Sequence, residues 1–131
     1  MSHEGEFIIY FVANTFLTND YEHCLRISQT DFSYVANSCL FEGNILRFRS
    51  LASMKVYEHA MLAGGDIEEN FDLLTQAIHY LHNAIDIYSA KEVMREFEQN
   101  FHGMALAYYS LGYIYLRFAD ELTNSQIKQH D

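Results

Sequence analysis

Three ionisable side chains in the second half of the chain have a spacing that could serve a metal site. His79, His82 and Asp86 stand at positions i, i+3 and i+7, so on a helix they share one face. Imidazole and carboxylate groups are common metal ligands. All three belong to one segment, whereas stable metal sites usually draw on more than one element. We therefore expect these side chains to be solvated, and we predict neither a metal site nor a cofactor.

Other arrangements that carry catalysis are missing from the sequence. No Glu has a His three residues later, as a di-metal site on paired helices requires, and no His-Glu-x-x-His motif occurs. Cys24 follows His23, but neighbours in a helix point to different faces. Cys39 lies in an apolar run and is predicted to be core. Because Gly64-Gly65-Asp66 also lacks the length and the lysine of a phosphate loop, we predict that the protein is not an enzyme.

Charge and cysteine content narrow the partners and the compartment. The net charge is −10, from 18 acidic and 8 basic residues, and such a surface repels nucleic-acid phosphates. Two cysteines form neither a disulfide framework nor a zinc pattern, which predicts reduced thiols in a cytoplasmic or nuclear protein. The apolar run FIIYFVA, residues 7–13, is short and follows acidic residues, so it predicts a core helix rather than a signal peptide or membrane span.

The elements that must position these residues are predicted to be helices. The chain has no proline and few strand signals, which favours one all-α domain over residues 1–131, built of five to seven helices in antiparallel hairpins. Gly64-Gly65-Asp66 should separate two helices, with Asp66 and Glu69 as a capping-box-like pair. Residues 123–131 are predicted to be a frayed tail. Helices are expected at 4–18, 21–29, from Phe32 to Ala63 with a break or kink at Gly43-Asn44, at 67–89, at Lys91–Glu98, and over 104–122.

The stretch ALAYYSLGYIYLRFAD, residues 105–120, carries two helical stripes. The main stripe has spacings of four and three residues and contains Met104, Tyr108, Leu111, Tyr115, Phe118 and Leu122. The second stripe contains small residues every seven positions, namely Ala105, Gly112 and Ala119. Small residues let another helix approach closely. Ala77 and Ala84 supply a matching stripe one helix earlier, so the two helices are predicted to pack together.

The same stretch holds more aromatic surface than one packed face needs. Tyr109 and Tyr113 fall four residues apart and off the main stripe. A tyrosine can be core with its hydroxyl in water, or it can be a binding contact. The surplus favours a partner-binding surface. Its predicted residues are Tyr108, Tyr109, Tyr113, Tyr115 and Phe118.

The final predicted helix resembles helix A of a tetratricopeptide repeat. That family carries a bulky aromatic, then Leu-Gly three residues later, then Tyr three after the Gly, and the matching residues are Tyr108, Leu111-Gly112 and Tyr115. The family's helix B pattern is matched by Ala77, Leu81 and Ala84. This resemblance implies a tetratricopeptide-like bundle that binds proteins, or itself, through helical surfaces.

The order of three segments also resembles the C-terminal homology domain of the AF4/FMR2 family. The segments are SLASMKVYEHAMLAGG, NFDLLTQAIHYLHNAI and GMALAYYSLGYIYLRF. That domain is itself tetratricopeptide-like and dimerises, so this resemblance implies the same architecture and a homodimer.

Three functions follow from these observations as hypotheses. The first is a non-catalytic interaction module, an adaptor, scaffold or self-associating subunit that uses the aromatic surface. The second is an acidic inhibitor that mimics nucleic acid and occupies a basic site, which the net charge suggests. The third is a small-molecule binder or an enzyme of unrecognised type with a pocket between helices. The expected partner is a protein or a second copy, with no direct contact to nucleic acid or membrane.

Overall fold

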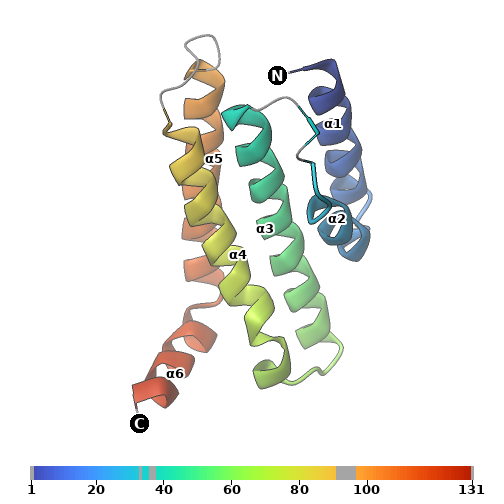
Figure 1. The fold of residues 1–131 in the computed structure, drawn as a ribbon. Helices are drawn as coiled ribbons and strands as arrows, with labels where there is room; N and C mark the ends of the chain where they lie inside the picture. Colours follow the sequence, from blue (N-terminus) through green and yellow to red (C-terminus); the bar gives the residue numbers. More distant parts are fainter. Residues whose placement is uncertain (1, 33, 36–37, 91–96, 131) are drawn as a thin grey trace.

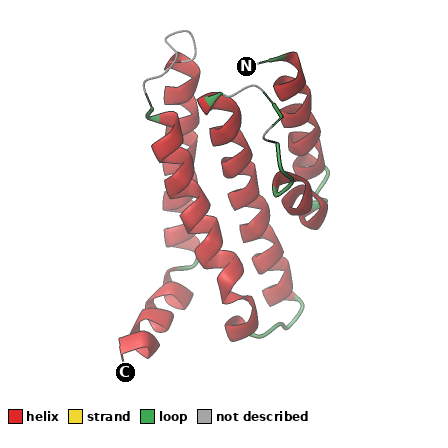
Figure 2. Ribbon diagram, viewed as in Figure 1, coloured by secondary structure: helices red, strands yellow, loops and turns green. Residues whose placement is uncertain are grey.

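All regular elements in the described part of the chain are helices. The computed structural model describes residues 2–32, 34–35, 38–90 and 97–130, of which 97 and 125–130 are described by their backbone only. The helices are α1 His3–Leu17, α2 Tyr21–Ser28, α3 Cys39–Leu62, α4 Ile67–Tyr88, α5 Phe97–Arg117 and α6 Ala119–His130 (Figures 1 and 2). The predicted all-α fold is confirmed. In Figure 1, α3, α4 and α5 run side by side, the α1–α2 pair lies against α3, and α6 projects away.

Short polar side chains cap the N-termini of three helices in this chain, which has no proline. The Ser2 hydroxyl accepts a hydrogen bond from the Gly5 amide at 3.1 Å, and Ser38 accepts one from the Phe41 amide at 3.2 Å. The Asp66 carboxylate accepts one from the Glu68 amide at 3.1 Å, so the cap engages Glu68 rather than Glu69 as the predicted box requires. Gly64, with φ of 84°, makes the left-handed turn that ends the helix before it.

The third helix begins later than predicted. It was expected from Phe32, but α3 begins at Cys39, after the cap at Ser38. Phe32 is instead held by a side-chain contact, because its ring meets the Phe41 ring edge-on at 5.8 Å. Of the break or kink expected at Gly43-Asn44, the break does not occur, since α3 runs through both residues.

The end of the chain differs from the prediction in two ways. The final helix was expected to continue to residue 122, but α5 ends at Arg117 and α6 begins at Ala119. Phe118, between them, turns its ring into the core and packs edge-on against Tyr57 at 5.4 Å. The predicted frayed tail is helical as far as His130. The predicted segment Lys91–Glu98 falls largely on residues 91–96, outside the described residues.

Two apolar cores share α3. One core joins α3, α4 and α5 and includes Leu74, Leu81 and Ile114. The other joins α1, α2 and α3 and includes Val12, Cys24 and Ile45. A helix with a core on both sides has apolar residues around most of its circumference, which explains why α3 shows no single apolar stripe.

Small polar residues bring α3 close to α4. The Ser50 hydroxyl donates a 2.6 Å hydrogen bond to the carbonyl of Ala77, and the Ser53 hydroxyl donates one of the same length to the carbonyl of Leu73. Both serines are fully buried. Backbone carbonyls of one helix can receive side chains of the next only when the two axes approach closely, and Ala77 permits this approach.

The ring of Tyr88, near the end of α4, packs between α3 and α5. A Cβ atom added at Gly43 would lie 2.4 Å from Tyr88 Cε1, and one added at Gly103 would lie 2.5 Å from the same atom. The ring therefore fills a socket formed by one glycine of each flanking helix. Its hydroxyl donates a hydrogen bond to Asn44 Oδ1. Burial raises the pKa of Tyr88, and the Arg47 guanidinium opposes part of this rise.

Candidate functional site: the outer face of α5

The exposed side of α5 is an aromatic surface without charge. We call it the α5 outer face and define it by five exposed side chains, Tyr108, Tyr109, Tyr113, Tyr115 and Leu116; Phe101, nearer the start of α5, is exposed as well. No Asp, Glu, Lys or Arg occurs from Gln99 to Leu116, so the face is bounded by Glu98 and Arg117. Tyr109 is 74% exposed and Leu116 is 83% exposed. A face this apolar and this open is typical of an interaction surface.

Four of the five predicted partner-binding residues lie on this face. Tyr108, Tyr109, Tyr113 and Tyr115 are exposed, whereas Phe118 is 3% exposed and belongs to the core. The main predicted stripe lies at the boundary between the buried and exposed sides of α5, because Leu111 and Phe118 are buried whereas Tyr108 and Tyr115 are exposed. The inner side of α5 is lined by Ala107, Leu111, Ile114 and Phe118. Small residues, including Gly103 and Ala107, decide the phase because they let α5 approach the other helices.

Of the two predicted small-residue stripes, the one on α4 is buried as predicted, whereas the one that begins on α5 is exposed. Ala77 and Ala84 are fully buried, and α4 packs against α5 as predicted. Ala105, Gly112 and Ala119 are exposed and do not pack α5 against α4. A Cβ atom added at Gly112 would have no neighbour within 4 Å. Ala105 and Gly112 instead form a shallow strip of backbone between the tyrosines of the α5 outer face.

A second exposed apolar face lies on α1, where we predicted only core. We call it the α1 outer face, and it consists of Phe7, Tyr10, Phe11 and Leu17. The prediction of a core helix for FIIYFVA is right for Val12, which is fully buried, and wrong for Phe7, Tyr10 and Phe11. The signal was present, since this run is apolar on every side of the helix while a peripheral helix buries only one side.

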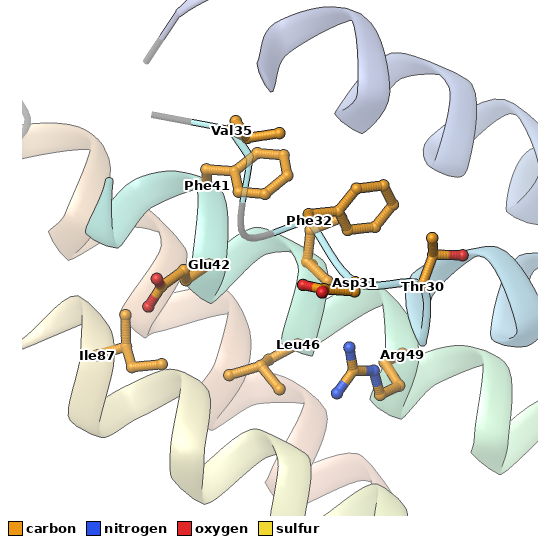
Figure 3. Close-up of a pocket in the computed structure, with 10 residues that line it drawn as sticks. Thr30, Asp31, Phe32, Val35, Phe41, Glu42, Leu46, Arg49 and Ile87 are labelled. Carbon is orange, nitrogen blue, oxygen red and sulfur yellow. The ribbon is translucent and has the colours of Figure 1, made fainter. Parts of the chain in front are cut away.

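A pocket of about 450 Å³ opens between residues 30–32 with Val35, α3 and the end of α4 (Figure 3). Phe32, Phe41 and Leu46 supply much of its apolar lining, and Asp31, Glu42 and Arg49 supply its charges. Arg49 Nε donates a 3.1 Å hydrogen bond to the carbonyl of Ser28, the last residue of α2. Burial lowers the pKa of Arg49. The guanidinium thus joins α2 to α3. Among the described residues that line the pocket there is no histidine or cysteine.

The residues considered for chemistry are dispersed. His79, His82 and Asp86 are exposed on α4, and His79 Nε2 lies 3.2 Å from Asn83 Nδ2. Within the described ranges, no group of three His, Cys, Asp or Glu side chains is placed to hold a metal ion. Cys24 and Cys39 are both buried thiols. Burial, the main cause, raises the pKa of the Cys24 thiol. A smaller fraction of this thiol is therefore ionised to the reactive thiolate.

Among the helices of the described residues, none combines the length and the apolar character needed to cross a bilayer. The two apolar outer faces belong to helices on different sides of α3, as Figure 1 shows for α1 and α5.

Comparison with protein-family models, curated proteins and solved structures found no match to this chain.

Proposed function

We propose that the chain is a non-catalytic protein–protein interaction module, and that a second copy of the chain docks on the α5 outer face. The observation that carries this proposal is Gly112. A glycine within a helix costs about 1 kcal/mol relative to alanine. An alanine Cβ at this position would touch nothing within 4 Å, so packing within one copy does not require glycine. Glycine at this position does favour the close approach of a helix from outside.

The α5 outer face suits an antiparallel pairing with itself. With a two-fold axis between Tyr108 and Tyr109, Ala105 of one copy faces Gly112 of the other. Tyr108 then lies beside Tyr109 of the other copy. The same arrangement brings Glu98 at one end of α5 toward Arg117 at the opposite end of the second helix. Glu98 and Arg117, which bound this face in the sequence, thus become complementary pairs, in addition to the 3.8 Å contact of Arg117 Nε with Glu58 Oε2 in the same copy.

The exposed apolar area is sufficient for a dimer of ordinary size. The five side chains are between 40% and 83% exposed. If each large side chain offers about 200 Å² in full, the α5 outer face presents about 600 Å² of largely apolar surface. A standard interface buries about 800 Å² on each partner, of which about 60% is apolar. The tetratricopeptide-like resemblance is consistent with such a role and stays a prediction.

Light scattering coupled to size exclusion, at several concentrations and two salt levels, tests this proposal. We expect a dimer that persists at high salt and that Tyr109→Ala/Tyr113→Ala converts to a monomer of unchanged helicity. Tyr10→Ala, an equally exposed tyrosine on α1, is the matched control and should leave the dimer intact. A wild-type monomer at every concentration would contradict the proposal. Association that disappears with salt would favour the acidic inhibitor instead.

A further inference from the structure

The α1 outer face is independent of the surface proposed for dimerisation. Phe7, Tyr10 and Leu17 are each more than 70% exposed and recur every three or seven residues along the same side of α1. The opposite side carries the buried residues Gly5, Val12 and Thr15, which close the core with α2 and α3. Folding of one copy therefore leaves the aromatic side of α1 without a covering element among the described residues.

The charges around this face are acidic. Helix α1 contains Glu4 and Glu6, both exposed, and no Lys or Arg. Helix α2 adds Glu22 in its first turn. Asp20, just before α2, is half-exposed and lies 3.1 Å from the imidazole of His23. Arg26, in the last turn of α2, is the one Lys or Arg side chain of these two helices. A ligand that covers the aromatic side chains would therefore lie within a predominantly negative rim.

The negative charge of this rim favours a basic partner helix over a second copy of the chain or an anionic lipid surface. A second copy would place the acidic α1 rims against each other, with no counterpart of the Glu98–Arg117 pairing available to α5. An anionic lipid surface would be repelled for the same reason, since helices that lie on membranes carry Lys and Arg. A helix with an apolar stripe flanked by Lys or Arg satisfies both the apolar side chains and the acidic rim.

We propose that the α1 outer face docks a cationic amphipathic helix of a partner protein. The apolar stripe of that helix covers Phe7, Tyr10 and Leu17, and its basic flanks face Glu4 and Glu6. Helix α1 packs on α2 and α3, whereas α5 packs on α3 and α4 (Figure 1). Both outer faces can therefore be occupied together, so that a dimer formed through α5 would carry two cationic helices.

Binding of a designed peptide tests this proposal on the full chain. The probe is a labelled amphipathic helix of Leu and Lys about 18 residues long, which is five turns, and the matched peptide has Glu in place of Lys. Fluorescence anisotropy should show binding of the Lys peptide only. Phe7→Ser/Tyr10→Ser should lower its affinity about 10-fold or more, as expected for aromatic anchors. Glu4→Gln/Glu6→Gln should lower both the affinity and its dependence on salt.

The controls separate this proposal from dimerisation and from general charge attraction. Tyr109→Ser/Tyr113→Ser on α5 should bind the Lys peptide as well as the wild type does, whether or not the protein dimerises. Amide chemical shifts of the wild-type protein should change along α1 when the Lys peptide is added, a readout that does not depend on a stable variant. Equal affinity for the Phe7→Ser/Tyr10→Ser protein, or shift changes confined to other helices, would overturn the proposal. Absence of binding by the Lys peptide would do the same.

Discussion

Alanine at Gly103 should destabilise the bundle, although alanine is the better helix former. The added Cβ would lie 2.5 Å from Tyr88 Cε1, and the ring cannot move away because Gly43 confines the same edge from α3. Overpacking of this kind costs about 1–3 kcal/mol, and the gain in helix propensity returns about 1 kcal/mol. We expect a net loss of up to about 2 kcal/mol in the free energy of unfolding. Gly112→Ala meets no atom within 4 Å and should raise that free energy by up to about 1 kcal/mol.

Urea unfolding followed by circular dichroism measures both effects on the same scale. The protein concentration should be low enough that no dimer contributes. The double variant Tyr88→Ala/Gly103→Ala completes a cycle, and the penalty of Gly103→Ala should largely disappear once the ring is gone. The reasoning would be refuted if Gly103→Ala stabilised the protein as Gly112→Ala does, or if its penalty were unchanged without the Tyr88 ring.

Three further predictions concern buried polar groups. Arg49→Met removes the hydrogen bonds to the Ser28 carbonyl and should cost about 1–3 kcal/mol, measured by urea unfolding, with Arg26→Met on the exposed side of α2 as the control. Burial raises the pKa of both Tyr57 and Tyr88, so the unfolded chain releases their protons first. Stability should therefore fall as the pH rises through about 10, the ordinary pKa of tyrosine, and Tyr57→Phe should reduce this slope in thermal melts across that range. Cys24 and Cys39 are buried, so both should react with a thiol reagent only as fast as the protein opens; rapid native-state labelling would contradict this.

Helix positions could be predicted from the sequence more reliably than helix rotations. Local signals such as Gly64 and Asp66 mark boundaries within the chain itself, and these were confirmed. The side that a helix buries depends on its neighbours. Because α5 and α1 are apolar around most of their circumference, their sequences permit several stripes, and close contacts at Gly103 and Val12 select one.

The start of α3 shows a second limit of the sequence. Phe32 and Val35 look like the first turn of a helix, but they are buried by contacts with residues that come later in the chain. The same limit applies to the candidate site. The tyrosines of α5 could be predicted because they exceed what one packed face can hold. The α1 outer face was missed, since a short apolar run predicts burial unless the number of packing neighbours is known.

The sharing of α3 between two cores has a consequence for how the chain folds during synthesis. Among the described helices, the main contacts join each helix to the next one or the next but one along the chain. Few contacts therefore require closure of a long loop, and such topologies fold quickly. The core of Val12, Cys24 and Ile45 can close once α3 has left the ribosome, before α4 emerges. The far side of α3 would then be exposed, and α4 would pack on a surface already in place.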